Sequence, residues 1–131
     1  MPLNPTSEIE TFKNPNIDRD YIVRFETHEF TCLCPLTDQP DFAHLFINYV
    51  PDKLNVELKS LKTYLWSFRN RGAFHEAVTN QIFDELVHKL HPRVIKIQAK
   101  WFVRGGIYTT VEAENIKETW TPTDSRILDK I

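Results

Sequence analysis

The fold is decided by residues 57–92, ELKSLKTYLWSFRNRGAFHEAVTNQIFDELVHKLHP, in which two amphipathic helices follow one another. In residues 57–71 apolar side chains recur at helical spacing, and Gly72 stands where helices commonly stop. In residues 74–91 a second apolar stripe ends just before Pro92. The two predicted stripes consist of Leu58, Leu61, Leu65 and Phe68, and of Val78, Ile82, Leu86 and Leu90.

Alternating or β-rich stretches on both sides of this helical pair predict strands. The first two are separated by turn residues, LTDQP, and the last two by the pair Gly105-Gly106. The order ββααββ indicates an α+β domain, with a four-stranded antiparallel sheet that carries both helices on one face. The predicted strands are residues 21–31, 42–50, 95–103 and 107–113.

A sheet of this kind leaves two edge strands open. Natural proteins cover or pair such edges, and for so small a unit we expect several copies to join their sheets into a barrel. The chain of 131 residues fits a single domain, with a core at about 18–115 and peripheral segments at 1–17 and 116–131. A homo-oligomer of this one domain is the expectation.

Composition excludes several classes of protein. With 41% hydrophobic and 26% charged residues the chain is neither disordered nor fibrous, and a net charge of −2 gives no general attraction to nucleic acid or to membranes. No apolar run approaches the roughly 20 residues that span a bilayer, and residues 1–10 are polar. We therefore expect a cytoplasmic protein without direct nucleic-acid or membrane binding.

The segment FTCLCPLTDQPDF, residues 30–42, holds both cysteines. Cys32 and Cys34 are too few for a disulfide framework, and without a second ligand cluster we expect no metal site. Asp41 lies across a turn from Cys34, so a thiolate and a proton donor can converge there. The alternatives are a small buried thiol and a turn aspartate.

Two further groups of residues are candidates for ligand binding. Lys59 and Lys62 share a helical face, and together with Arg104 before the glycine pair they can hold phosphate; a solvated charged face and a simple hairpin are the alternatives. Phe74 can stack on a heteroaromatic ring, and Glu76 can accept hydrogen bonds from the N–H groups of that ring. A hydrophobic staple and a helix-dipole partner explain the same two residues.

In their order and wording these segments resemble the NADPH-dependent 7-cyano-7-deazaguanine (preQ0) reductase family, in its short single-domain form. The resemblance covers about residues 9–114 and rests on residues 30–42, residues 57–76 and the RGG at 104–106. The family's NADPH-associated motif is matched at seven of the eight positions 57–64, with Thr63 as the departure.

The resemblance implies the tunnelling fold (T-fold) shared with GTP cyclohydrolase I, with active sites between subunits and a decamer of two pentameric rings. It also implies reduction of the preQ0 nitrile to the amine of preQ1 with NADPH, on the route to queuosine in tRNA. Cys34 then matches the nucleophile and Asp41 the proton donor. His75 matches a substrate position, and the chemistry of the reaction suggests that it also relays a proton. Substrate positions by resemblance are Val56, Glu57, Leu58, His75 and Glu76, and the stacking argument adds Phe74 to them. Lys59, Lys62 and Arg104 match positions suited to the cofactor phosphates.

Two other functions remain open at this stage. One is a different T-fold enzyme acting on a purine or pterin, such as a relative that also forms a thioimidate but transfers ammonia and makes an amidine. The other is a module that binds a purine-like ligand without turnover. The cations Lys59, Lys62 and Arg104 favour a nicotinamide cofactor over the first, and Cys34 with Asp41 favours an enzyme over the second.

Overall fold

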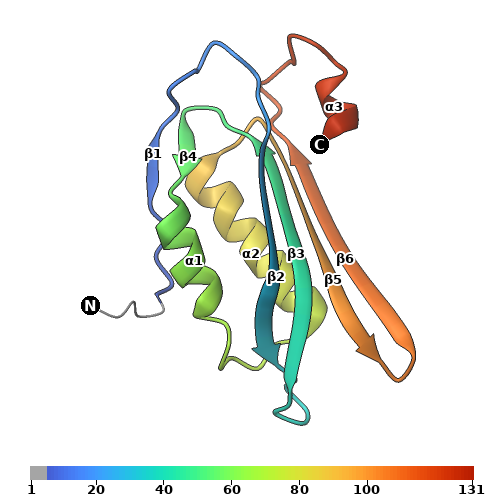
Figure 1. The fold of residues 1–131 in the computed structure, drawn as a ribbon. Helices are drawn as coiled ribbons and strands as arrows, with labels where there is room; N and C mark the ends of the chain where they lie inside the picture. Colours follow the sequence, from blue (N-terminus) through green and yellow to red (C-terminus); the bar gives the residue numbers. More distant parts are fainter. Residues whose placement is uncertain (1–5) are drawn as a thin grey trace.

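The computed structural model of the protein describes residues 6–131 and contains six strands and three helices there (Figure 1). The first five residues of the predicted peripheral segment 1–17 lie outside the described residues. The strands are β1 (Thr11–Lys13), β2 (Val23–Leu33), β3 (Pro40–Val50), β4 (Leu54–Val56), β5 (Val94–Arg104) and β6 (Ile107–Ile116), and the helices are α1 (Leu58–Trp66), α2 (His75–Leu90) and α3 (Ile127–Lys130).

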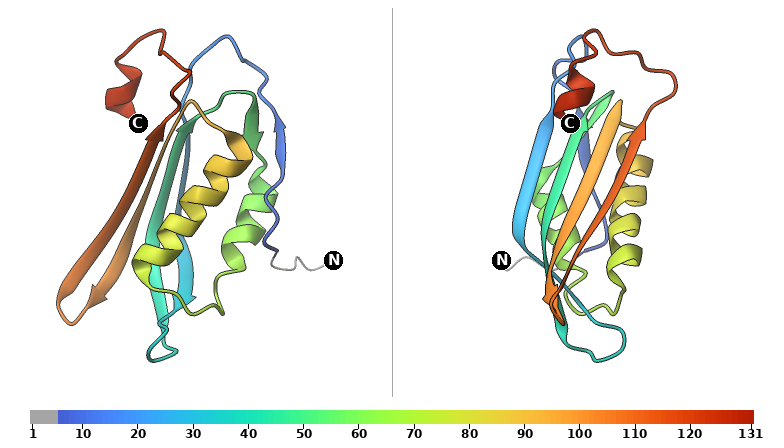
Figure 2. Two further views of the ribbon diagram at one scale, coloured as in Figure 1. Left: turned by 180° about the vertical axis from the view of Figure 1, so that it is seen from behind. Right: turned by 90° about the vertical axis from the view of Figure 1, so that its right-hand side faces the viewer.

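Four long strands form one antiparallel sheet in the order β2-β3-β5-β6. Helices α1 and α2 lie on the same face of this sheet (Figure 2). The predicted α+β architecture is therefore confirmed, with each long strand within a few residues of its expected position. Within one chain, β2 and β6 form the two open edges of the sheet.

The core lies between the sheet and the two helices α1 and α2. Side chains of β3 and β5 alternate in burial, and the buried ones face the helices. Burying each large aliphatic side chain contributes about 1.5–3 kcal/mol to folding. The predicted stripe of α2 is fully buried, and it meets the inward side chains of the two central strands, which are Ala43, Leu45, Ile47, Tyr49, Ile95, Ile97, Ala99 and Trp101.

The first helix is shorter than the sequence indicates. It ends at Trp66 rather than at Arg71, because the chain tightens there into turns with backbone bonds three residues apart, such as Arg71 N to Phe68 O at 3.0 Å. Phe68 remains fully buried in this turn. Because the helical spacing of apolar residues continues past Trp66 to Phe68, the sequence predicted the end of this helix several residues too late.

A second, two-stranded sheet pairs β1 with β4 and was not predicted. It is held by a buried polar network, in which the Tyr49 hydroxyl donates to Asn55 Oδ1 (2.9 Å) and accepts from the backbone N–H of Val56 (3.1 Å). Asn55 Nδ2 donates in turn to the Tyr21 hydroxyl at 3.0 Å. This network fixes the backbone from which α1 begins.

The carboxyl-terminal segment is fastened to the body of the domain by charged side chains. Lys117 Nζ lies 2.6 Å from Asp52 Oδ2, and Arg93 bridges Asp20 and Asp52 at 3.0 and 3.3 Å. Arg24 donates to the backbone carbonyl of Lys130 at the end of α3 (2.6 Å). None of the helices in residues 6–131 combines the length and the apolar character needed to cross a membrane.

Candidate active site

The turn between β2 and β3 holds Cys34. Strand β2 ends at Leu33, which pairs with Pro40, and the turn is closed by bonds from Cys34 N to Gln39 O (2.8 Å) and from Asp38 N to Cys34 O (2.9 Å). Asp38 adopts the left-handed backbone conformation (φ 58°), which Asp tolerates better than most residues. The turn therefore holds the Cys34 backbone firmly and leaves its side chain partly exposed.

The segment between α1 and α2 joins the end of β2 like a short extra strand. Leu33 N donates to Arg71 O at 2.9 Å, and Ala73 N donates to Leu33 O at 3.0 Å. Helix α2 begins two residues after Ala73. These two backbone bonds therefore bring the start of α2, with His75 and Glu76, to the turn that carries Cys34.

The two thiols differ in acidity. A hydrogen bond from the Thr37 hydroxyl, followed by the backbone N–H groups of Leu36 and Thr37, lowers the pKa of Cys34. Burial, with the charges of Asp41 and Cys34, raises the pKa of Cys32 to about 11. Because the thiolate is the nucleophilic form of cysteine, these differences favour Cys34 over Cys32, which is a buried thiol of the core.

Asp41 is buried and contacts two basic side chains. Arg104 Nη2 donates to Asp41 Oδ1 at 2.5 Å and to the carbonyl of Pro40 at 2.7 Å. On the other carboxylate oxygen, His75 Nε2 lies 3.3 Å from Asp41 Oδ2. Since Asp41 stands opposite Cys32 in the strand pairing, this carboxylate lies at the same end of the sheet as Cys34.

The face of the His75 ring is also in contact with an aromatic side chain. Its ring is stacked on the indole of Trp101, with centroids 4.0 Å apart and planes 2° from parallel. Phe74, the residue before α2, is 56% exposed, and Glu76 is exposed in the first helical turn. An aromatic ring, an imidazole and a carboxylate thus belong to three consecutive residues at the start of α2, which the backbone bonds of Leu33 bring to the turn that carries Cys34.

The remaining predicted site residues lie elsewhere in the chain. Val56 is buried in β4, Glu57 caps α1 by accepting from the backbone N–H groups of Lys59 (2.9 Å) and Ser60 (2.6 Å), and Leu58 is exposed. The backbone N–H groups lower the pKa of Glu57, with the bond from Ser60 contributing most. In Figure 1 the start of α1 lies beside β4, away from the turn between β2 and β3.

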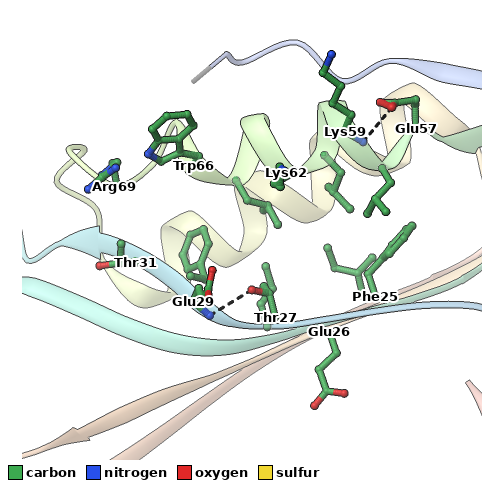
Figure 3. A pocket seen from close by; sticks show the side chains of 16 residues that line it. Phe25, Glu26, Thr27, Glu29, Thr31, Glu57, Lys59, Lys62, Trp66 and Arg69 are labelled. Atoms are coloured by element: carbon green, nitrogen blue, oxygen red, sulfur yellow. Dashed lines mark hydrogen bonds between the residues drawn. The ribbon is translucent and has the colours of Figure 1, made fainter. Parts of the chain in front are cut away.

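A groove of about 980 Å³ runs between α1 and the edge strand β2 (Figure 3). Lys59 and Lys62 line it, together with Trp66 and Arg69, whose guanidinium carbon lies 5.7 Å from the Trp66 ring centroid. Arg104 does not line this groove. Within one chain the three predicted cofactor residues therefore do not lie together: Lys59 and Lys62 line the groove, whereas Arg104 binds Asp41.

Sequence reasoning missed three contributors to these sites. Trp101 was assigned to the core because its strand alternates, and its contact with His75 depends on how strands and helix pack. Thr37 stands three residues after Cys34 in a turn, and that spacing is the signal by which it could have been found. Arg69 lies in the turns that follow the observed end of α1 at Trp66, within a stretch that the sequence assigned to the helix. Within residues 6–131 the structure contains no group of three or more His, Cys, Asp or Glu side chains suited to a metal ion.

Comparison with known proteins gives one consistent answer. The family described as QueF-like protein matches residues 40–120. The NADPH-dependent 7-cyano-7-deazaguanine reductase of Nitrosospira multiformis is 58% identical over 125 residues, which are 95% of this chain and 90% of that protein. The reductases of Alkalilimnicola ehrlichii (56% identity; 93% and 95% of the two chains) and Nitrosomonas europaea (54%; 98% and 93%) are similar over comparable lengths.

A solved structure shares the fold. The crystal structure of the archaeosine synthase QueF-Like in the apo form superimposes with a TM-score of 0.66 and covers 71% of this chain and 91% of its own. At 22% identity this likeness supports the fold alone, whereas the reductases match at 54–58% over almost the whole chain. The chain belongs to the NADPH-dependent 7-cyano-7-deazaguanine reductase family, a family of oxidoreductases.

Proposed function

We propose that this chain reduces the nitrile of preQ0 to the primary amine of preQ1 with NADPH, through a thioimidate on Cys34, in queuosine biosynthesis. The observation that carries the proposal is a partly exposed thiol of lowered pKa at the same end of the sheet as the Asp41–His75 pair. The names of relatives at 54–58% identity support the substrate and the cofactor. A reducing compartment such as the cytoplasm suits a nucleophile that has to stay a free thiol.

The first step needs a thiolate and a proton. The Cys34 sulfur donates an electron pair to the nitrile carbon, one π pair of the C≡N bond moves to nitrogen, and nitrogen takes one proton. The hydrogen bond from Thr37 favours the thiolate that this attack requires. The product is a neutral thioimidate with a trigonal carbon.

The proton comes from the pair formed by Asp41 and His75. Asp41 is the donor to the nitrile nitrogen, and His75, 3.3 Å from its carboxylate, passes a proton on to it. Arg104 holds the other carboxylate oxygen, so the carboxyl cannot rotate freely. Burial of Asp41 keeps bulk water from competing for the same proton.

The groove along α1 fits a dinucleotide cofactor. Lys59, Lys62 and Arg69 supply positive charge for phosphate groups, and Trp66 supplies a flat apolar surface on which a ring can stack. When bound, NADPH supplies the two hydrides, one from each of two molecules, that convert the nitrile carbon to an amine carbon. The chain itself contributes the cations and the aromatic surface that hold this co-substrate.

The active site is completed by a second copy of the chain. Cys34, Asp41 and His75 lie at one end of the sheet, whereas Val56, Glu57 and Leu58 lie at the start of α1 on another part of the same chain. Both sheet edges, β2 and β6, are open in one chain and can pair with neighbouring copies. A ring of copies closed through these edges, such as the pentamers of a decamer, would place one group against the other, with Glu76 and Phe74 on the substrate ring.

The decisive experiment is loss of NADPH absorbance at 340 nm on addition of preQ0. We expect NADPH oxidation only when preQ0 is present. We also expect Cys34→Ala to bind preQ0, to oxidise no NADPH and to show no adduct by intact-mass analysis. An adduct in Cys34→Ala would exclude Cys34 as the nucleophile, and binding of preQ0 without NADPH oxidation by the native chain would favour a ligand-binding module.

Mixed oligomers test the shared site. Cys34→Ala and Lys62→Glu are each expected to be inactive alone. When the two are co-expressed in equal amounts, about a quarter of the sites should combine an intact thiol from one copy with an intact groove from another. Activity would then return to about a quarter of the native level. If each chain carried a complete site, no activity would return.

A further inference from the structure

Trp101 is in direct contact with the candidate site through His75, although it is almost completely buried. It is only 3% exposed, on β5, and its backbone stands opposite Ala43, two residues from Asp41 on the neighbouring strand. Phe30 packs edge-on against its indole, with ring centroids 6.0 Å apart. The edge of Phe30 therefore helps to hold the indole in place within the core.

The stack on Trp101 restricts the one motion that would separate His75 from Asp41. An imidazole on a flexible side chain can turn about its Cβ–Cγ bond, and the single contact to Asp41 Oδ2 at 3.3 Å is too weak to stop that rotation. A parallel indole at 4.0 Å stops it, because any large rotation would drive the imidazole edge into the ring face. The indole thus defines the plane in which Nε2 points at the carboxylate.

We propose that Trp101 is a positioning residue for catalysis, whose indole face holds the His75 ring in the plane that aims Nε2 at Asp41. The proposal rests on the proposed function, in which His75 passes a proton to Asp41. Trp101 itself contacts neither the substrate nor the reacting atoms. It acts through His75 alone, and this makes its effect separable from that of ordinary packing.

The indole N–H provides a clean conservative variant. Among the described residues the buried Nε1 of Trp101 has no hydrogen-bond acceptor. Trp101→Phe therefore keeps a flat ring for the stack and removes no hydrogen bond, whereas Trp101→Leu keeps an apolar side chain and loses the flat ring. Phe68→Leu is the matched control, since Phe68 is fully buried and lies two contacts away, against Phe30.

Steady-state kinetics with preQ0 and NADPH provide the first test. We expect Trp101→Leu to lower kcat about tenfold, with KM for preQ0 changed less than about threefold, because one aromatic pair is lost while the binding groups remain. Trp101→Phe should retain kcat within about threefold, and Phe68→Leu should be less stable but equally active. In a His75→Ala background, Trp101→Leu should change kcat less than about twofold. Equal losses in Trp101→Phe and Trp101→Leu, or an undiminished effect without His75, would overturn the proposal.

A second measurement does not depend on activity. The ring current of a stacked indole shifts the carbon-bound protons of His75 upfield, and selective histidine labelling makes these NMR signals visible. The shift should persist in part in Trp101→Phe and vanish in Trp101→Leu. A His75 signal that is unchanged in Trp101→Leu shows that the stack is absent in solution and refutes the positioning role. Loss of that shift in Trp101→Leu, in a protein that does not oxidise NADPH with preQ0, refutes the proposed function instead.

Discussion

Arg104 separates two accounts of the site. By resemblance it binds cofactor phosphate together with Lys59 and Lys62, yet its guanidinium donates to Asp41 at 2.5 Å and to the Pro40 carbonyl at 2.7 Å. In the proposed mechanism, formation of the thioimidate from preQ0 uses Asp41 but no NADPH. The rate of adduct formation without NADPH therefore reports whether Arg104 serves the carboxylate.

The expected size of the effect follows from the exposure of this pair. A hydrogen bond to a charged group is worth about 1.5–3 kcal/mol when it is shielded. The Arg104 side chain is 47% exposed, so screening by water reduces its contribution to about 1 kcal/mol. Arg104→Met should then slow adduct formation about fivefold, because the carboxyl is aligned with the nitrile nitrogen for a smaller fraction of the time.

The assay is stopped-flow absorbance of the thioimidate after mixing with preQ0 in the absence of NADPH. Lys62→Met is the matched control and should raise KM for NADPH without changing this rate. Arg104→Lys keeps the charge but replaces the planar guanidinium, whose Nη2 contacts both oxygens, by a freely rotating ammonium, so a similar loss there identifies placement of Asp41, and not charge, as the cause. An unchanged adduct rate in Arg104→Met, combined with a raised KM for NADPH, would refute the reasoning and return Arg104 to the cofactor.

Three further predictions concern other parts of the site and fold. Thr37→Val should raise the pKa of Cys34, because the thiolate loses a hydrogen bond. The pH at which iodoacetamide reacts with Cys34 at half its maximal rate should then increase. Thr37→Ser keeps the hydroxyl and should leave this pH unchanged. Tyr49→Phe should lower the free energy of unfolding, measured in urea at fixed protein concentration, by about 2–4 kcal/mol, because Asn55 Oδ1 and the N–H of Val56 lose their partner. The same change at the exposed Tyr108 should lower it by less than about 0.5 kcal/mol. Glu76→Ala should weaken preQ0 binding by at least about tenfold in calorimetry on a Cys34→Ala background, and an unchanged dissociation constant would remove Glu76 from ring recognition.

The long elements were predictable because each is governed by one strong period. Residues of β3 and β5 alternate between core and opposite face, and the stripe of α2 recurs every three or four residues. Pro92 and the glycine pair at 105–106 marked the breaks correctly. The predicted end of α1 was wrong, because the buried Phe68 fits the helical spacing although it lies in the turn after the helix.

Strands β1 and β4 could not be predicted for a different reason. Each has three residues, which is too short for any alternation to be recognised. They exist because Tyr49, from the central sheet, supplies a hydroxyl for the backbone of Val56, and because Ile9 is buried in the core just before β1. Such contacts link residues far apart in the chain and leave no local trace.

The candidate site, too, has parts that local sequence predicts and parts that depend on packing. Convergence of Cys34 and Asp41 followed from a turn between antiparallel strands, which is local information. The pairing of Arg104 with Asp41 depends on the register of β3 and β5, and the stack of His75 on Trp101 depends in addition on how α2 packs. Residue types alone suggested phosphate binding for Arg104, and only the packed structure provides its carboxylate partner.

The backbone connections explain why, in a single chain, the groove along α1 lies away from the turn that carries Cys34. The turn bearing Cys34 is held by backbone bonds to Arg71 and Ala73, so it is tied to the segment that follows α1 and precedes α2. The groove residues Lys59 and Lys62 lie on α1 itself, before that segment. The backbone bonds that bring the start of α2 to the Cys34 turn therefore leave Lys59 and Lys62 on the other side of this segment, on α1. If the thiol and the lysines are both needed for one reaction, the missing half has to come from another copy, and the open edges β2 and β6 are the surfaces through which that copy can bind.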